Sequence, residues 1–375
     1  MEAMSEQSHL STPLPVLAIG LMSGTSMDGI DVALLWTDGE TIAEPRGFAF
    51  RTYPPDFRSA LAAALQAPDQ QAPALEAALT AYHRDAVRAL LAQTGTAAVD
   101  VALIGFHGHT VLHRPAERRT WQLGDGQRLA DGLGIPVVGD LRTADVAAGG
   151  EGAPLAPVYH RALAASVPKP CAFLNLGGVA NVTWIGAAAE DLIAFDTGPA
   201  NMLLDEWALR HTGEPVDKDG ALARAGTVDA QVLAKLMTAA YFSRKPPKSL
   251  DRLDFELAAV AHLSPADGAA TLVAFTAASI AAAQRHMPSQ PKCWTVCGGG
   301  RHNPVLMRLL QECLPAPVQP SEALGIDGDA LEAEAFAYLA VRSVRSLPIS
   351  FPGTTGTPRA LTGGRLFEPA GRMAQ

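Results

Sequence analysis

The first part of the chain alternates apolar runs with polar turns, a pattern that predicts strands and helices in mixed order. Val16–Leu21 and Ile30–Trp36 are β-type runs, and the segment between them is rich in Ser, Gly and Asp. The pair therefore predicts a β-hairpin with a long tip. Gly47–Thr52 predicts a third strand, and the Ala- and Leu-rich pattern of Ala60–Gln93 predicts helix. Two short apolar runs bounded by turn residues are typical of buried strands, Val101–Gly105 and Ile135–Val138.

A similar arrangement starts again in the second half. Strands are expected at Ala172–Leu176 and Asn181–Ile185, on either side of a Gly-Gly turn, and at Leu192–Phe195. The rest of the chain predicts helices at about 200–209, 228–240 and 265–286, a strand at Trp294–Cys297, and helices at about 304–313 and 327–344. Because both halves open with a hairpin and continue with alternating strands and helices, the pattern predicts an α/β fold of two lobes with a central cleft.

The boundary between the lobes is expected where Ser166–Pro170 interrupts a helical pattern. This gives an N-terminal lobe at residues 15–167 and a C-terminal lobe at residues 168–375. Residues 1–14 are polar and acidic, without the basic and apolar regions of a signal peptide, and are expected to be a disordered tail.

Composition narrows the classes of function. The 375 residues are 48% hydrophobic with a net charge of −9 and no run of Lys or Arg, which argues against a nucleic-acid surface. The most apolar stretch, Ala269–Ala283, is too short to span a bilayer. A cytoplasmic protein without a membrane or nucleic-acid partner is therefore expected.

The tip of the first hairpin has the chemistry to bind a polyphosphate. Its Gly-Thr-Ser sequence offers backbone N–H groups and two hydroxyls, and two aspartates could hold Mg²⁺. A hairpin turn capped by Ser and Asp is an equally good interpretation of the residues alone. On the phosphate hypothesis the cofactor-binding residues are Gly24, Thr25, Ser26, Met27, Asp28, Gly29, Ile30 and Asp31, with Asp28 and Asp31 as metal ligands.

Two later segments fit the same hypothesis. Asp196 is expected at the end of an apolar strand, where a carboxylate points into the ligand crevice of an α/β sheet and could abstract a proton, although a helix cap is nearly as good an interpretation. Glycines after a later strand would let a nucleotide lie against the backbone, with a plain flexible turn as the alternative. The further cofactor-binding residues expected are Gly177, Gly198, Gly298, Gly299 and Asn303.

Polar residues expected in loops after strands are candidates for sugar binding. They are His107, Gln122, Arg142 and Asp145; Asn181, the first residue of a predicted strand, is a further candidate. His107 and His109 lie two apart, but no third ligand is evident, so hydrogen-bonded histidines are the better interpretation. Glu332 and Glu334 lie on different faces of a late helix, and periodicity does not say which carboxylate is buried.

Several motifs, in the same order along the chain, resemble the anhydro-N-acetylmuramic acid kinases. They are Gly24–Gly29, Phe106–Thr110, Leu174–Asn181, Asp196–Asn201, Cys297–Gly300 and Glu334–Ala337. The resemblance runs from about residue 16 to 344. It implies the two-lobed fold of actin, hexokinase and Hsp70-type ATPases, with ATP between the lobes. It also implies the reaction, in which ATP and water convert 1,6-anhydro-N-acetylmuramic acid into N-acetylmuramic acid 6-phosphate and ADP during peptidoglycan recycling.

The resemblance and the residue pattern agree on Asp196 as the general base. Glu334 is expected to be a second catalytic residue that orients the water or the metal shell. Two departures from the family pattern stand out: Met22 where related ATPases carry Asp, and Glu151 where the family often has Gln. The alternatives are an ordinary sugar kinase of the same fold, a non-catalytic sugar or nucleotide sensor, and a glycosidase that works without ATP. The sequence leaves open whether the protein forms a homodimer.

Overall fold

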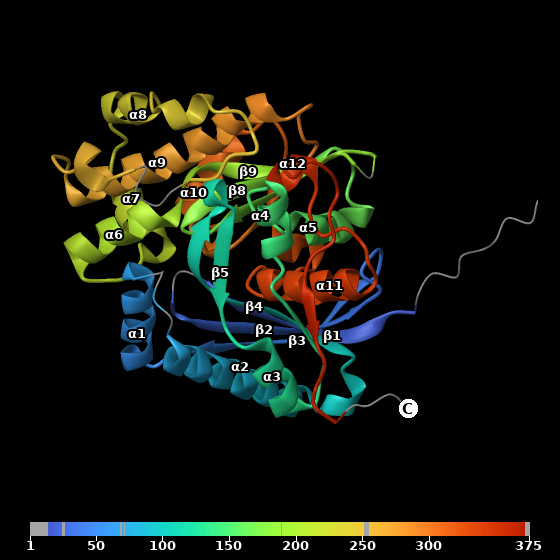
Figure 1. The fold of residues 1–375 in the computed structure, drawn as a ribbon. Coiled ribbons are helices and arrows are strands. Elements are labelled where there is room, and N and C mark those ends of the chain that lie inside the picture. Colours follow the sequence, from blue (N-terminus) through green and yellow to red (C-terminus); the bar gives the residue numbers. More distant parts are fainter. Residues whose placement is uncertain are drawn as a thin grey trace, which may run out of the picture.

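Two β-sheets organise the molecule (Figure 1). The computed structural model describes residues 14–24, 27–67, 70, 72–188, 190–250 and 255–371. The first sheet has the order β12-β6-β4-β1-β2-β3, with β5 paired to β4, and the second has the order β11-β10-β7-β8-β9. The strands of the first sheet are β1 (Val16–Ser23), β2 (Gly29–Thr37), β3 (Ala43–Thr52), β4 (Leu103–Arg114), β5 (Arg119–Leu123), β6 (Val137–Gly139) and β12 (Arg365–Phe367). Those of the second are β7 (Cys171–Leu176), β8 (Val179–Ile185), β9 (Leu192–Pro199), β10 (Trp294–Cys297) and β11 (Val318–Pro320).

Helices cover both faces of the first sheet. In Figure 1, α2 and α3 lie below it, α1 stands beside its left end, and α11 lies above it, between the two sheets. The α-helices up to the second sheet are α1 (Pro55–Gln66), α2 (Pro73–Thr94), α3 (Gly126–Leu133), α4 (Thr143–Ala148) and α5 (Pro157–Leu163). Those after it begins are α6 (Asn201–Thr212), α7 (Ala221–Ala225), α8 (Ala230–Leu236), α9 (Pro265–Ala283), α10 (Pro304–Cys313), α11 (Leu331–Val344) and α12 (Pro352–Thr355).

The sheet and α11 pack closely because two glycines face the helix. A Cβ atom at Gly20 in β1 would overlap the backbone carbonyl of Ala333, and one at Gly105 in β4 would overlap that of Phe336. The absence of side chains at these positions lets α11 lie directly on β1 and β4. The first turns of α11 are thereby placed at the boundary between the lobes.

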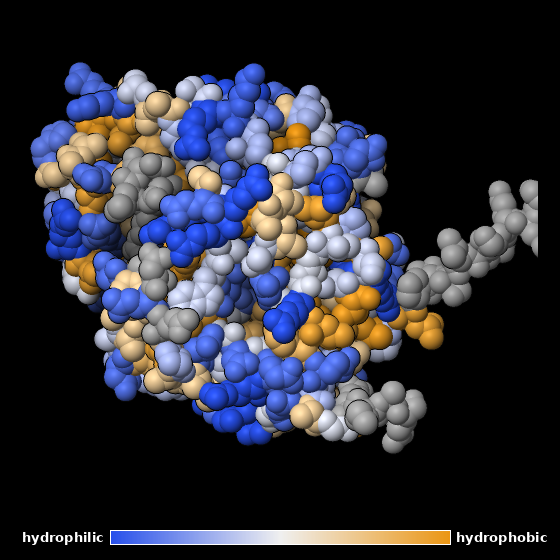
Figure 2. All heavy atoms as spheres, viewed as in Figure 1, coloured by the Kyte–Doolittle hydropathy of each residue, from blue (hydrophilic) through white to orange (hydrophobic). Residues whose placement is uncertain are grey.

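The second sheet packs against α6, α7, α9 and α10, seen in Figure 1 at the upper left. The helix Pro265–His286 is long and apolar enough to cross a membrane, but 67% of its most apolar window is buried inside the molecule. Its apolar character is therefore explained by its place in the core of this lobe. On the face drawn in Figure 2, hydrophilic residues predominate and hydrophobic ones form small groups between them.

The end of the chain returns to the first sheet. After the second sheet, α11 packs on β1, β2 and β4, and β12 pairs with β6 in antiparallel register. Between them, α12 packs against β9 of the second sheet. Residues from 331 on thus contact both lobes, whereas the sequence analysis assigned all of 168–375 to the second.

The main sequence predictions of architecture are confirmed, with local corrections. β1 and β2 form the predicted hairpin, and α10 has the predicted bounds. The helical pattern predicted at 60–93 corresponds to two helices, α1 and α2. His107 and His109 lie within β4 and not in a loop. Gly108, between them, has φ 73°, and its conformation explains why the sequence resembled a turn there.

Candidate active site

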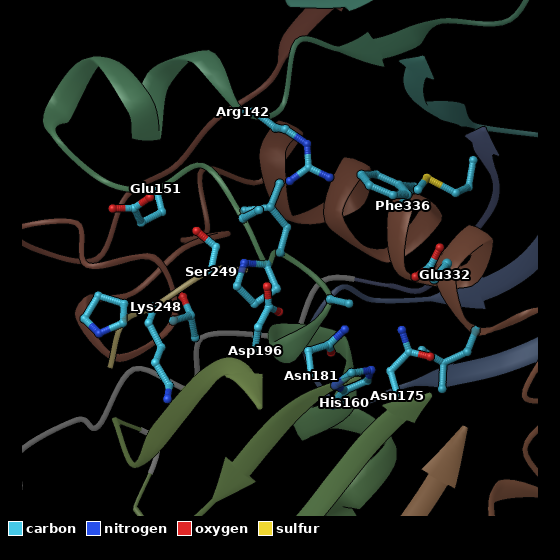
Figure 3. Close-up of a pocket in the computed structure, with 18 residues that line it drawn as sticks. Arg142, Glu151, His160, Asn175, Asn181, Asp196, Lys248, Ser249, Glu332 and Phe336 are labelled. Atoms are coloured by element: carbon cyan, nitrogen blue, oxygen red, sulfur yellow. The ribbon is translucent and has the colours of Figure 1, made fainter. Parts of the chain in front are cut away.

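A cavity of about 210 Å³ lies between the lobes, and residues of both line it. Figure 3 shows strands of the second sheet below it and α11 and α4 above it. Polar groups face it from each side, among them Arg142, Asn175, Asn181, Asp196, Lys248 and Glu332. Cations and anions thus line one cavity, the setting in which ligands and reacting groups are bound.

Asp196 is held firmly at the floor of this cavity. It lies inside β9, opposite Asn181 of β8, and not at the strand's end as predicted. The Leu250 N–H donates to Asp196 Oδ2 at 2.9 Å, the Asp196 N–H donates to the Lys248 carbonyl at 3.0 Å, and the Tyr241 hydroxyl donates to the Asp196 carbonyl at 2.7 Å. Asp196 Oδ1 accepts no hydrogen bond from a residue that the structure describes. One carboxylate oxygen is therefore fixed, and the other has no partner among the described residues.

The surroundings of Asp196 suit a proton acceptor. Burial raises its pKa to about 6, against the opposing effects of the Leu250 N–H and the charge of Lys248. The pKa of Lys248 is itself lowered to about 8 by burial. A carboxylate with a pKa near 6 is ionised at neutral pH and is a stronger base than an ordinary aspartate.

The structure distinguishes Glu332 from Glu334. Glu332 faces the cavity near Phe336 (Figure 3). Glu334, the predicted catalytic residue, is 1% exposed, does not line the cavity, and accepts a hydrogen bond from the Tyr159 hydroxyl at 2.7 Å. Burial raises the pKa of Glu334 to about 7, whereas Glu332 is exposed at the cavity. The carboxylate that can meet a ligand is that of Glu332.

Several carboxylates act on Asp31 in β2. Asp31 pairs with Met22 of β1, which lines the cavity in the place where related ATPases carry Asp. Burial, together with the charges of Glu332, Asp28 and Asp329, raises the pKa of Asp31 to about 7. This concentration of negative charge is one that a divalent cation would relieve.

The carboxylates fit a metal shared with a ligand better than one held by protein alone. Mg²⁺ commonly takes one or two carboxylates and completes its shell with water and phosphate oxygens. Within the described ranges, no cluster of three or more His, Cys, Asp or Glu side chains could hold a metal ion. Asp28 and Asp31, the predicted ligands, therefore suit an ion that arrives with a polyphosphate.

The tip of the first hairpin is described only in part. The Met27 N–H donates to the Gly24 carbonyl at 3.1 Å, and Met27 has φ 57°. Thr25 and Ser26, two of the predicted phosphate ligands, lie outside the described residues. Gly29 and Ile30 belong to β2, where both are buried.

A buried hydrogen-bond chain anchors the base of this hairpin. The Tyr53 hydroxyl donates to Ser23 Oγ at 2.9 Å, and Ser23 Oγ lies 3.0 Å from His109 Nδ1. All three side chains are nearly inaccessible to solvent. His109 is thus a hydrogen-bonded histidine, as the sequence analysis favoured, and it connects the hairpin to β4.

The predicted sugar-binding residues divide between two cavities. Arg142 and Asn181 line the interlobe cavity. His107 and Gln122 line a second cavity of about 230 Å³, formed by β4, β5 and Phe367 of β12. His107 also bonds to Arg142, so this histidine connects the two cavities.

Asp145 lines neither cavity, because its carboxylate is occupied by the backbone and by the C-terminal segment. Asp145 Oδ1 accepts from the Gly152 N–H at 2.7 Å, and Oδ2 accepts from the Thr355 hydroxyl at 2.6 Å. Asp145 therefore holds the glycine-rich loop that carries Glu151 against α12.

The predicted nucleotide-binding residues have different surroundings. A Cβ atom at Gly299 would meet nothing within 4 Å, whereas one at Gly298, with φ 75°, would overlap the Asn175 side chain. Gly198 packs against Ser279. The Gly177 carbonyl accepts from the N–H at the start of α6. The Asn303 side chain caps α10 by accepting from two backbone N–H groups. Gly299 is therefore exposed, with no atom packed over the position of its missing side chain.

Sequence reasoning missed His160, which lines the cavity from α5. It is 2% exposed, its Nδ1 lies 2.8 Å from the Thr183 hydroxyl, and its ring stacks on Phe173 at 5.1 Å. Its Nε2 is buried with no partner among the described residues. Buried polar atoms usually have a hydrogen-bond partner, so this nitrogen is available to a ligand or water. A single histidine in a helix gave no signal.

Asn175 and Lys248 were also missed. Asn175 pairs with Asn181 across β7 and β8, and a polar residue within an apolar strand was the signal that could have found it. Lys248 is 5% exposed, and its Nζ lies 4.4 Å from the centre of the Tyr241 ring. It belongs to the segment that holds Asp196.

The family model and the curated relatives that match this chain have the same name, and they match it over nearly its whole length. A family model described as anhydro-N-acetylmuramic acid kinase matches residues 16–369. The protein of that name from Rhizorhabdus wittichii is 54% identical, covering 94% of this chain and 99% of the relative. The one from Paramagnetospirillum magneticum is 55% identical, covering 94% and 100%. Among solved structures, the ROK hexokinase from Thermus thermophilus has a TM-score of 0.40 at 15% identity, covering 87% of this chain and 99% of that one.

Proposed function

This chain belongs to the anhydro-N-acetylmuramic acid kinase family, and from this premise we propose how its cavity carries out the reaction. The enzyme uses ATP and water to convert 1,6-anhydro-N-acetylmuramic acid into N-acetylmuramic acid 6-phosphate and ADP, a step of peptidoglycan recycling. Its fold is the two-lobed fold of actin- and hexokinase-like ATPases. The fixed but partly free carboxylate of Asp196 is the observation that carries the proposal.

Asp196 is proposed as the general base. Its free oxygen takes a proton from a water that attacks C1 of the sugar, and the bond from C1 to the bridging O6 breaks. O6 then attacks the γ-phosphorus of ATP, and ADP leaves. The hydroxyl derived from water stays on C1, and Asp196 later returns its proton to solvent. Three hydrogen bonds to residue 196 and its backbone hold the carboxylate in one orientation, which such a transfer requires.

Glu332 is proposed for the role that the sequence analysis gave to Glu334. Its carboxylate is in the cavity. The charge of Arg142 acts on Glu332, and the charge of Glu332 acts on Asp31. From this position Glu332 can orient the attacking water or the metal shell. His160 Nε2, also in the cavity, is a second group that can bind water or a sugar hydroxyl.

ATP is proposed to extend from the first hairpin to the glycine turn after β10. Backbone N–H groups at the tip of the hairpin bind the phosphates, and the exposed face of Gly299 receives the adenosine. Asp28 and Asp31 would hold Mg²⁺, which would neutralise charge on the phosphates. We expect the reaction to take place in the cytoplasm, where ATP is available, without a nucleic-acid or membrane partner. A homodimer is compatible with this proposal.

The pH dependence of sugar turnover tests the proposal. Because burial raises the pKa of Asp196 to about 6, the base is lost to protonation as the pH falls through 6. We expect ADP release to require the anhydro sugar, and its kcat/KM to fall about tenfold per pH unit below pH 6. A coupled ADP assay at saturating Mg-ATP measures this. A profile that stays flat down to pH 4.5 would exclude Asp196 as the base.

A further inference from the structure

The guanidinium of Arg142 is held in a defined orientation at the roof of the cavity. Its Nε and Nη2 both lie 3.0 Å from His107 Nε2, and its Nη1 donates to the Gly152 carbonyl at 2.6 Å. A guanidinium has five N–H groups. These contacts leave one N–H on each of Nη1 and Nη2, a number that matches the two oxygens of a carboxylate. Figure 3 shows the guanidinium pointing into the cavity.

This cation forms no salt bridge within the part of the chain that the structure describes. The charges of Glu332 and Asp145 act on it, but neither carboxylate is within ion-pair distance. Asp145 is occupied by Gly152 and Thr355. Burial lowers the pKa of Arg142 to about 10, so the group is still a cation at neutral pH. A partly buried cation that lines a cavity and has no ion pair with a described residue is a site for an anion.

The orientation of the Arg142 guanidinium depends on the tautomer of His107. His107 Nδ1 lies 2.9 Å from the Gly108 carbonyl, to which only an N–H can donate. The proton is therefore on Nδ1, and Nε2 has the free lone pair that accepts from Arg142. Burial, and then the charge of Arg142, hold the pKa of His107 well below its usual range. The ring packs against Phe336, with centroids 4.7 Å apart, so it has little freedom to turn.

We infer that Arg142 binds the lactyl carboxylate of the sugar and that His107 is the residue that positions it. The inference rests on the proposed function, which supplies a substrate whose only charged group is that carboxylate. On this inference His107 acts through Arg142, whereas the sequence analysis expected it to contact the sugar directly. Selectivity for the muramic over the glucosamine anhydro sugar would then originate at Arg142.

A phosphate of ATP is the other anion that this cation could meet. The position of Arg142 favours the sugar. It bonds to the loop that carries Glu151, whereas Gly299 and the described residues of the hairpin tip, where we place ATP, do not line the cavity that Arg142 lines. Glu151 lines the same cavity, but its side chain lies apart from the guanidinium in Figure 3. The negative charge of Glu151 therefore leaves Arg142 free for the substrate.

The test compares two substrates in variants of these two residues. 1,6-Anhydro-N-acetylglucosamine lacks the lactyl group but keeps the anhydro bridge. In His107→Leu, which removes the acceptor, we expect kcat/KM for the muramic sugar to fall about 10- to 100-fold, mainly through KM, and that for the glucosamine sugar to change less than threefold. His107→Gln places an oxygen near the position of Nε2 and should recover most of the loss. Arg142→Lys keeps the charge but not the two-pronged donor, and should lose selectivity as His107→Leu does.

Other outcomes overturn the inference. An equal loss with both sugars would mean that His107 has only a structural role. A rise in KM for ATP with unchanged sugar selectivity would assign Arg142 to phosphate. If His107→Leu does not fold, Arg142→Lys gives the same comparison by itself. Wild-type protein that releases no ADP with either sugar would refute the proposed function, a result distinct from loss of selectivity in the variants.

Discussion

Asp196→Asn is expected to lower kcat by about 10²- to 10⁴-fold while ATP and sugar still bind. An amide has nearly the shape of the carboxylate, and its oxygen can accept from the Leu250 N–H as Asp196 Oδ2 does. The segment over β9 should therefore keep its position. What the variant loses is the ability to take a proton from water. Steady-state kinetics and isothermal titration calorimetry on the same preparation measure the two quantities.

The chain offers a matched control for this variant. Burial raises the pKa of Asp205, in α6, to about 6, as it does that of Asp196, but Asp205 does not line the cavity. Asp205→Asn should change kcat less than twofold. Normal turnover by Asp196→Asn, with normal affinities, would contradict the role of Asp196 as base.

Glu332→Gln is expected to have the second largest effect, a fall in kcat of about 10²-fold. Its carboxylate is in the cavity and acts on both Asp31 and Arg142. The amide keeps the volume but removes the charge that would orient water or the metal shell. KM for the sugar should change less than kcat, because the proposed sugar contact is through Arg142.

Glu334→Gln, two residues away on the same helix, is the control. A glutamine oxygen can accept from the Tyr159 hydroxyl, so the buried hydrogen bond survives the change. Its kcat should stay within about fivefold of wild type, which initial rates at saturating substrates measure. A larger loss in Glu334→Gln than in Glu332→Gln would return the catalytic role to Glu334 and refute the assignment made from the cavity.

The fold was predictable where the pattern is local. The first hairpin follows from two apolar runs around a polar tip, and α10 from a capping Asn followed by Pro. The position of His107 was not predictable, because Gly105 looks like the end of a strand when read locally. In the structure Gly105 makes room for Phe336 of α11, a residue more than two hundred positions away. Close packing between distant segments leaves no local signal.

The site was predictable where a residue stands out from its strand. Asp196 and Asn181 are polar residues in apolar runs, and both face the cavity. The choice between Glu332 and Glu334 depended on how α11 lies on the first sheet, which periodicity alone does not give. His160 could not be found, since its orphaned Nε2 has meaning only when the surrounding cavity is known.

The central claim is that water, activated by Asp196, opens the anhydro bridge before O6 takes the phosphoryl group. Turnover in ¹⁸O-water, followed by mass spectrometry of the sugar phosphate, tests this most directly. Exchange at the anomeric carbon is measured with unlabelled product kept in the same water for the same time. We predict one ¹⁸O on C1 above this background and none in the phosphate. Label in the phosphate, or none on C1, would contradict the mechanism.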